Sequence, residues 1–360
     1  MTDVRGFVNT PAEWIEATRK GELRVLTPSS VVECSTPLTG DGLKLSRLQS
    51  YVSPPATVAV LPGGLSIGKD GAVATSDGLL ILATVQRLHS PPVMHPAWYA
   101  ASASAETIYF DGVLAVPTHN GSLNFAHVLA DGVGRMWLLQ RCGYRPDAWV
   151  VPETPPDWLA EMLDLIGICE ADRLYVRSDT VIQARTLLLP SSTGFGWGTA
   201  PWARTAVYEM LKINRLPQSR PSKVWVSRLH SSLRRWKEEE RASAALEERG
   251  FRICHLETLS LSTQLEIVCN SGVIAGVHGA GLAWALGSRC TTGLVYEVAP
   301  PTIVHNSFRS ISSVIGWSYG RTRCADVGVH AGNDVHRDFS LEPVEVLASL
   351  DDAMAKCRLG

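Results

Sequence analysis

The stretch Val273-Ile274-Ala275-Gly276-Val277-His278-Gly279-Ala280-Gly281, residues 273–281, decides the fold. Its first five residues are apolar or small, as in a buried strand, and the glycines that follow permit a sharp turn into a helix. A helix that begins there offers unpaired backbone N–H groups and a partial positive charge, which suit a diphosphate. The same letters are equally typical of a tight strand-to-helix turn that binds nothing, because short glycine motifs are weak indicators.

Strands and helices alternate along the chain around this turn. The alternation predicts an α/β fold in which a parallel sheet carries helices on both faces. Ligands of such sheets bind beyond the carboxyl ends of the strands. The expected strands are 223–227, 251–255, 273–277 and 293–298, and the expected helices are 236–249, 261–270 and one that begins at Gly281.

The N-terminal half has a less regular pattern of short strands, turns and helices. Strands are expected at 56–61, 71–75, 78–85, 148–151 and 186–189, with a pair of strands within 108–117 and helices at about 124–139 and 158–168. A glycine-rich loop at 191–201 marks a domain boundary. At 360 residues, the chain is long enough for two domains. We therefore expect domains at 1–205 and 206–330, and a loop and helix at 331–360 that pack back on them.

Composition and charge exclude several classes of function. A formal net charge of −2 argues against a nucleic-acid-binding protein, which needs a concentrated basic face. No stretch approaches the ~20 apolar residues that cross a bilayer, and the N-terminus has no secretory pattern. We therefore expect a cytoplasmic protein and leave open a peripheral membrane association and the oligomeric state.

The pattern of cysteines and histidines predicts no bound metal. The eight cysteines are scattered without a C-x-x-C pair, so we interpret them as reduced thiols rather than as a zinc site or a disulfide framework. His330 and His336 lie near Asp334, but their segment has no periodicity and is interpreted as a solvated loop.

An arginine-rich segment follows the strand expected at 223–227. Arg228 comes directly after Ser227 and is therefore expected at the ligand-binding edge of the sheet. A guanidinium there can hold phosphate oxygens and stabilise a departing diphosphate without a metal ion. A surface loop of solvated arginines is an equally good interpretation for Arg228, and the better one for Arg234 and Arg235 taken alone.

Two further sets of polar residues are candidates. Glu297 lies at the end of the strand 293–298, where a carboxylate can bind a ribose or simply meet solvent. Asn124 begins the helix that carries His127 and Asp131, which share one face because they are four residues apart. His127 or Asp131 can remove a proton from an attacking hydroxyl, although a pair at this spacing is more often structural.

Taken together, these segments resemble glycosyltransferase family 61. Asn124–His127 is similar to the family's N-[FY]-x-H segment, Val226–Arg228 with Arg234-Arg235 to its I-S-R…R-R stretch, and 264–281 to its Q…H-G-A-G segment. Val295–Val298 resembles the closing V-x-E-[IV] strand. The chain departs from the family where Glu238 replaces Asn, where Ala283-Trp284 replaces Thr-Asn, and where 288–292 lacks Pro-Gly.

The resemblance implies two Rossmann-type domains that face each other across a cleft, as in GT-B enzymes. It implies an inverting, metal-independent hexosyl- or pentosyltransferase without a cofactor. Its donor is expected to be a nucleotide-sugar, and we expect a UDP-sugar. A hydroxyl of a glycan or other acceptor would be the second substrate, in bacterial polysaccharide biosynthesis. The residues expected to contact the donor are Asn124, Ser227, Arg228, Arg234, Arg235, His278, Gly279, Ala280, Gly281 and Glu297.

Besides a purely structural partner protein that binds no ligand, two alternatives to an active transferase stay open at this point. One is a non-catalytic protein that binds sugar nucleotides on the same fold. The other is a nucleotide-dependent oxidoreductase, although its G-x-G-x-x-G should follow the first strand of the unit, whereas the glycines here come late and in a different order.

Overall fold

The computed structural model describes residues 4–39, 48–85, 107–196, 198–324 and 337–358, and its chain divides into two compact units. Unit 1 comprises residues 1–29 and 54–193, and unit 2 comprises residues 30–53 and 194–360. This division differs from the boundary expected at 205/206, because residues 194–205 and the separate segment 30–53 belong to unit 2. The segment is tied there by backbone contacts, such as the bridge between Pro37 and Tyr319.

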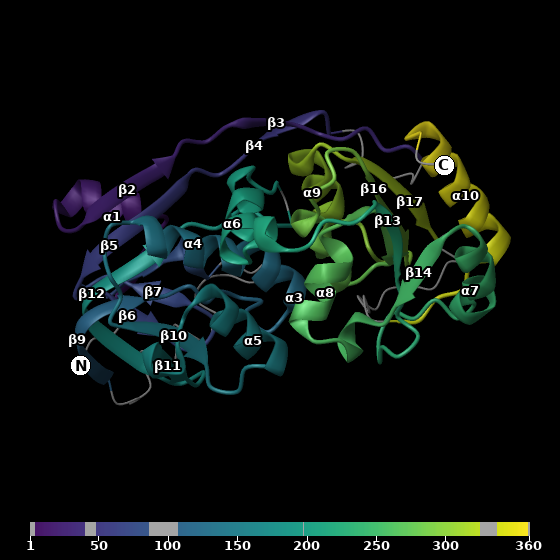
Figure 1. Ribbon diagram of the computed structural model, residues 1–360. Coiled ribbons are helices and arrows are strands. Elements are labelled where there is room, and N and C mark those ends of the chain that lie inside the picture. Colours follow the sequence, from purple (N-terminus) through teal and green to yellow (C-terminus); the bar gives the residue numbers. More distant parts are fainter. Residues whose placement is uncertain (1–3, 40–47, 86–106, 197, 325–336, 359–360) are drawn as a thin grey trace. The chain divides into compact units, whose positions relative to one another are not determined.

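Unit 2 is built on a parallel sheet in the order β14-β13-β15-β16-β17 (Figure 1). This confirms the parallel α/β arrangement predicted from residues 223–298. The edge strand β17 was not predicted, because its sequence Ser-Tyr-Gly-Arg-Thr-Arg has no apolar run. The strands are β13 (Ser222–Val226), β14 (Phe251–Cys254), β15 (Ser271–Val277), β16 (Leu294–Ala299) and β17 (Ser318–Arg323).

Helices cover both faces of this sheet. Helices α7 (Glu239–Glu248) and α10 (Pro343–Lys356) lie on one face, and α8 (Leu261–Val268) and α9 (Ser307–Ile315) lie on the other (Figure 1). The core under α7 and α10 includes the buried side chains of Trp225, Trp236, Tyr296 and Leu350. The C-terminal helix α10 contacts α7, β16 and β17, and so packs within unit 2.

The remaining elements of unit 2 are short. Helix α6 (Trp202–Met210) contacts the 3-10 helix η8 (Ala280–Gly287), which follows β15. Strands β3 (Val31–Glu33) and β4 (Ser50–Val52) pair in an antiparallel ribbon within the segment 30–53. Two further 3-10 turns are η6 (Ile213–Arg215) and η7 (Leu256–Thr258).

Unit 1 contains a mixed sheet in the order β1-β8-β7-β6-β12-β9-β10-β11, with β5 paired to β12 and β2. The segment 108–117 forms one long strand rather than the expected pair, because β9 pairs in parallel with the long strand β12. The strands are β1 (Gly6–Val8), β2 (Glu22–Thr27), β5 (Ala56–Pro62), β6 (Leu65–Ile67), β7 (Ala72–Ala74), β8 (Leu79–Ile81), β9 (Thr107–Ala115), β10 (Ala148–Pro152), β11 (Arg173–Val176) and β12 (Val181–Pro190).

The helix expected at 124–139 is interrupted in the structure. It consists of α3 (Phe125–His127), a π-helical turn η4 (Val128–Gly132) and α4 (Val133–Arg141). Single π turns inside helices are frequent at functional sites, and this one carries the candidate residue Asp131. The other helical elements of unit 1 are α1 (Pro11–Thr18), α5 (Asp157–Ile166), η2 (Leu82–Thr84) and η5 (Glu170–Asp172).

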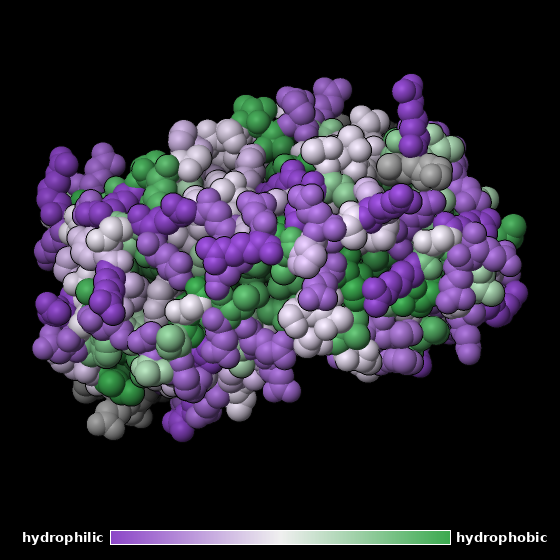
Figure 2. All heavy atoms as spheres, in the orientation of Figure 1, coloured by the Kyte–Doolittle hydropathy of each residue, from purple (hydrophilic) through white to green (hydrophobic). Residues whose placement is uncertain are grey.

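None of the helices that the structure describes is both long and apolar enough to cross a bilayer. Hydrophilic residues predominate on the face drawn in Figure 2, with hydrophobic patches between them.

Candidate functional site

The strand order of unit 2 places two candidate segments at one edge of the sheet. Numbered along the chain, the order β14-β13-β15-β16-β17 is 2-1-3-4-5, so the direction of winding reverses between β13 and β15. Ligands of doubly wound sheets bind outside the carboxyl ends of the two strands at such a reversal. Arg228 follows β13 and His278 follows β15, so both residues lie at this switch point.

Arg228 lies against the glycine turn. A Cβ atom added to Gly279 would lie 2.5 Å from the Arg228 Nη1 atom, so the absence of a side chain at residue 279 makes room for the guanidinium. Nη2 donates to the Ser231 hydroxyl at 2.5 Å and to the Leu233 carbonyl at 2.6 Å. Nη1 has no acceptor among the described residues, so this N–H group is available to a ligand.

Arg234 provides a second guanidinium in the same place. Its backbone has a positive φ of 57°, and its Nε is buried without a hydrogen-bond partner among the described residues. Burial and the neighbouring Arg234 charge together lower the pKa of Arg228 to about 10, which still leaves it charged at neutral pH. Burial also lowers the pKa of Arg234, and an anion beside these two half-buried cations would favour their charged forms.

Arg235 does not join this pair. Its side chain is exposed and binds Asp338, with Nε and Nη2 at 3.0 and 2.7 Å from Oδ2. Ser227 is also turned inward: its hydroxyl accepts the Leu229 N–H at 3.2 Å, and its side chain is buried. In the structure, Arg235 and Ser227 therefore make their contacts within the protein, although both were expected to contact the nucleotide-sugar.

The glycine turn itself has the geometry expected for an anion site. Helix η8 begins at Ala280. Its N-cap residue is Gly279, so no side chain caps the helix. The first N–H groups of a helix have no partner within it, so the amides of Ala280 and Gly281 make no hydrogen bond inside η8. The helix is of the 3-10 type. A Cβ atom added to Gly281 would lie 2.7 Å from Val226 Cγ1, so close packing of the helix against β13 requires glycine here.

His278 and Glu297 form a buried pair. The Nδ1 atom of His278 lies 2.6 Å from Oε1 of Glu297. The other carboxylate oxygen of Glu297 accepts the Tyr319 hydroxyl at 2.6 Å, and Glu297 is 1% exposed. Both of its oxygens are thus engaged within the protein, and a contact of Glu297 with a ribose stays a prediction. The Glu297 carboxylate fixes the orientation of the His278 ring.

Electrostatics keep this pair as a carboxylate and a neutral imidazole. Burial alone would raise the pKa of Glu297, but the Arg321 and His278 side chains outweigh it and lower the pKa to about 2. Burial lowers the pKa of His278, although Glu297 opposes the effect. With its Nδ1 proton donated to the carboxylate, a neutral His278 has an Nε2 atom that can accept a hydrogen bond.

Two residues near this pair escaped the sequence analysis. Arg321, on β17, is fully buried, and its Nη2 lies 3.5 Å from Glu297 Oε1. His305 packs edge-on against His278 with ring centroids 5.1 Å apart. Burial lowers the pKa of His305 to about 4, and His278 contributes to the shift. Both come from segments without apolar periodicity, and only the sheet order brings them to the switch point.

Glu239 supports the loop that carries Arg228. Its carboxylate is buried and accepts the Trp225 Nε1–H at 2.8 Å and the Arg228 backbone N–H at 3.2 Å. Burial raises its pKa, and these hydrogen bonds oppose the rise. The neighbouring departure from the family pattern, Glu238, accepts the Leu341 N–H at 3.2 Å, and Trp284 donates to Gln264 Oε1 at 2.9 Å. Both departures thus serve packing within unit 2.

The candidate residues of unit 1 have distinct surroundings. Asn124 caps α3, since its Oδ1 accepts the Ala126 N–H at 3.0 Å and the His127 N–H at 3.4 Å. Asp131 is buried and bound by Arg135 at 2.9 Å and by the Thr193 N–H at 2.5 Å. Burial would raise the pKa of Asp131, but Arg135 and His119 hold it well below its usual range. These contacts make Asn124 a cap and Asp131 a fixed anion.

His127 keeps the properties of a base. Its ring is half-buried, and burial lowers its pKa despite the opposing charge of Asp131, so it is neutral near pH 7. Gly121 has a φ of 132°, and a Cβ there would lie 2.9 Å from the His127 ring, so the loop before α3 fits closely around it.

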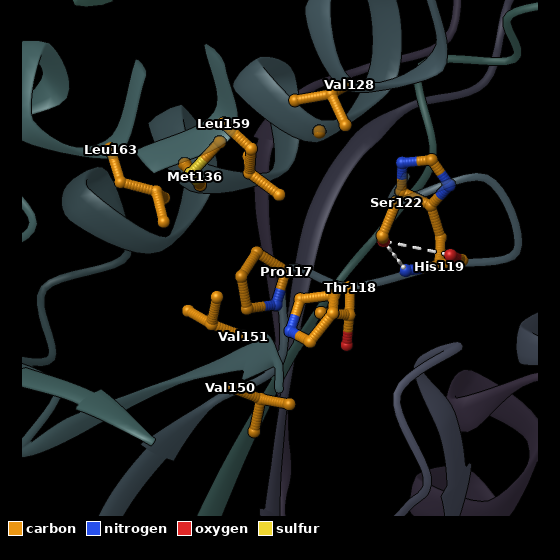
Figure 3. A pocket seen from close by; sticks show the side chains of 12 residues that line it. Pro117, Thr118, His119, Ser122, Val128, Met136, Val150, Val151, Leu159 and Leu163 are labelled. Carbon is orange, nitrogen blue, oxygen red and sulfur yellow. Dashed lines mark hydrogen bonds between the residues drawn. The ribbon is translucent and has the colours of Figure 1, made fainter. Parts of the chain in front are cut away.

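A second histidine, His119, was missed by the sequence analysis. It is buried, its ring centroid lies 6.2 Å from that of His127, and its Nε2 lies 3.8 Å from Asp131 Oδ2. Burial lowers its pKa to about 4. Figure 3 shows His119 at one side of a pocket whose other walls are mostly apolar. The lining residues are Pro117, Thr118, His119, Ser122, Val128, Gly132, Met136, Val150, Val151, Pro152, Leu159 and Leu163.

The remaining expectations concern thiols and metals. The structure describes all eight cysteines, and none of them is joined to another in a disulfide. The segment with His330, Asp334 and His336 lies outside the described residues.

Comparison of the sequence with known proteins and family models gives a match to a family model. No curated protein matches the chain. The family model described as Glycosyltransferase 61 matches residues 125–295, a segment that holds His127, Arg228 and the whole glycine turn. The ordered motifs and this match agree, and both relate residues 125–295 to glycosyltransferase family 61.

Proposed function

We propose that this protein transfers a sugar from a nucleotide-sugar, UDP-linked, to a hydroxyl acceptor, with inversion at the anomeric carbon and without a metal ion. The observation that carries the proposal is the pairing of Arg228 and Arg234 beside the amides of 279–281 at the switch point of unit 2. Two guanidinium groups and a helix start supply the charge that a divalent cation would otherwise supply to a departing diphosphate.

The neighbouring residues suggest how the donor is oriented. In this proposal Arg228 Nη1, Arg234 and the amides at 279–281 hold the diphosphate. His278 accepts a hydrogen bond from a donor hydroxyl through Nε2, because Glu297 fixes its ring from the other side. Arg235, Ser227, Asn124 and Glu297 then act through the fold rather than on the donor.

The acceptor hydroxyl would lose its proton to His127. A neutral imidazole is a suitable general base at neutral pH, and burial keeps His127 neutral. The attacking oxygen forms the new bond to the anomeric carbon as the bond to the diphosphate breaks, and the diphosphate leaves as an anion held by the arginines. We further propose that the two units face each other across a cleft, as in GT-B enzymes, and that the reaction belongs to bacterial polysaccharide or glycan biosynthesis in the cytoplasm.

A thermal-shift screen of sugar nucleotides tests donor binding, because a ligand that binds only the native state raises its apparent stability. A UDP-sugar should raise Tm, and the same compound should be consumed with an acceptor mixture in the presence of EDTA. A strict requirement for Mn²⁺ would contradict the proposal. Binding without hydrolysis or transfer would favour the non-catalytic alternative, and binding of NAD(P) in its place would favour an oxidoreductase.

A further inference from the structure

A cluster of metal-ligating side chains lies outside the donor site described above. The ligand atoms of His230, His255 and Glu257 all lie within 4.8 Å of one another. The two imidazole rings are stacked, with centroids 4.1 Å apart and planes inclined by 20°. The Nδ1 atom of His255 is buried and has no hydrogen-bond partner among the described residues. A buried polar atom without a partner is costly, so a ligand that engages it would stabilise the cluster.

The sheet holds these residues in place from two neighbouring strands. His230 lies in the turn after β13, whose Ser231 N–H bonds to the Arg228 carbonyl at 3.0 Å. His255 directly follows β14, and its carbonyl accepts both the N–H and the hydroxyl of Thr258, at 3.0 and 2.8 Å. Because β13 and β14 pair in parallel with Val226 opposite Cys254, both histidines emerge at the same edge of the sheet.

We infer that His230, His255 and Glu257 form a binding site for a divalent transition-metal ion of the zinc type. Two imidazoles and one carboxylate suit Zn²⁺ or Co²⁺ better than Mg²⁺ or Ca²⁺, which prefer oxygen ligands. Ligands of one tetrahedral zinc ion lie about 2.0–2.2 Å from it and so about 3.5 Å from one another. Ligand atoms as much as 4.8 Å apart would therefore close by about 1 Å when the ion binds. Three protein ligands leave a coordination position for water.

The ion would fasten the loop that carries Arg228. His230 follows Arg228 by two residues, and the negative charge of Glu257 acts on the Arg228 guanidinium. A cation bound by His230 and Glu257 joins the segment after β13 to the segment after β14 and offsets the Glu257 charge. It joins two segments beside the anion site and is not required for the transfer step, so this inference stands apart from the proposed reaction.

Titration of the metal-free chain with Co²⁺ in the absence of any sugar nucleotide tests the site. We expect one ion per chain, with visible absorption bands of a nitrogen- and oxygen-ligated ion and without the ultraviolet bands of thiolate ligation. Replacing either histidine, H230A or H255A, should weaken binding by about 10-fold or more, since even outer-shell changes can cost that much. The variant E257Q should weaken it as well.

A double variant, H330A/H336A, provides the control, because it removes two histidines from another part of the chain. It should bind Co²⁺ like the parent chain. Unchanged binding in a folded H230A/H255A double variant would overturn the inference, and so would absorption bands that show sulfur ligands from the free cysteines. Neither result depends on whether the protein transfers a sugar, so a failure here is separate from a failure of the proposed function.

Discussion

At the scale of single residues, Arg228 and Arg235 lie in the same segment but have different surroundings. We propose that Arg228 acts on the donor and that Arg235 has a structural role. Arg228 faces the glycine turn, whereas Arg235 faces Asp338. We expect R228A to lower turnover by about 10²-fold or more, the usual cost of losing one charge-stabilising donor. Steady-state kinetics with a UDP-sugar measure this effect.

The matched control is R235A, which removes the same group from an exposed position seven residues away. It should change kcat by less than about threefold, a small effect that suits an exposed ion pair. Equal losses in both variants would show that the segment matters only through its total charge, and Arg228 would then have no special place in the reaction.

His127 and Asp131 share a helix face but should respond differently to mutation. H127A removes the proposed base, so kcat should fall by about 10²–10⁴-fold while the donor Kd is unchanged, because the donor binds unit 2. Calorimetry and initial rates separate the two quantities. A normal kcat in a folded H127A variant would assign proton removal to another group.

Asp131, in contrast, is expected to matter for stability. D131N leaves Arg135 buried without its partner at 2.9 Å, and breaking a buried pair costs about 3–5 kcal/mol. The comparison is D352N, which breaks an exposed pair with Lys356 at 2.6 Å and should cost less than about 1 kcal/mol. Urea unfolding of the two variants measures both, and equal costs would mean that burial of Asp131 is unimportant.

At the scale of elements, strand β15 contains two glycines that differ in the space available for a side chain. A Cβ at Gly276 would lie 2.3 Å from the Val226 carbonyl oxygen, so G276A must push β15 away from β13. At Gly272 the nearest atom to an added Cβ would be 3.6 Å away, an ordinary contact. G276A should lower the free energy of unfolding by about 2 kcal/mol or more, and G272A should lower it far less. Denaturant titration decides, and equal stability of the two variants would refute the steric argument.

Elements with a strong local signal were predictable from the sequence. Strands β13, β14, β15 and β16 agree with their expected ranges within two residues, because each is a short apolar run between turn signals. Strand β17 was missed because its sequence contains arginines, which are typical of exposed segments. Arg321 is buried because it pairs with Glu297, and no local pattern in the sequence reveals that partner. Helix α7 begins at Glu239 rather than at 236, since Trp236 is used as a buried anchor and donates to the Leu341 carbonyl.

The candidate site, too, was predictable only where its residues adjoin elements with a strong local signal. Arg228, His278 and the glycine turn follow strands that the sequence marks, so their common edge could be inferred. The internal bonds of Glu297 could not, because they depend on partners whose positions only the folded chain defines. The cap at Asn124 is a local pattern that the sequence offered as the structural interpretation of this helix. The pair of Asp131 with Arg135 is also local, four residues apart, but carried no signal that distinguishes structure from catalysis. His119 and His305 lie in loops and carry no spacing signal.

At the scale of the whole molecule, buried neutral histidines predict how stability depends on pH. Burial lowers the pKa of His119 from 6.5 to about 4. The unfolded chain therefore takes up a proton as pH falls below 6.5, while the folded chain does so only near pH 4, and stability is lost across this interval. A shift of this size corresponds to about 3 kcal/mol, and His305 acts in the same direction.

Unfolding titrations at several pH values between 7 and 4 measure this loss. The variant H119Q should show a shallower decline than the parent chain, whatever its stability at pH 7. An unchanged slope would show that folding does not lower the pKa of His119. Below pH 4.5, protonation of Glu297 in the unfolded chain extends the decline, because its folded pKa is about 2.

The segment 30–53 has a consequence for how the protein is made. Its backbone is bound by residues far along the chain: the Ser35 and Leu48 carbonyls accept hydrogen bonds from Arg309 at 2.8 and 2.7 Å. On the ribosome these residues emerge more than two hundred positions before Arg309 is synthesised. Unit 2 can therefore complete its fold only after translation has almost finished, and a gene fragment that starts at residue 194 would encode it without one of its own parts.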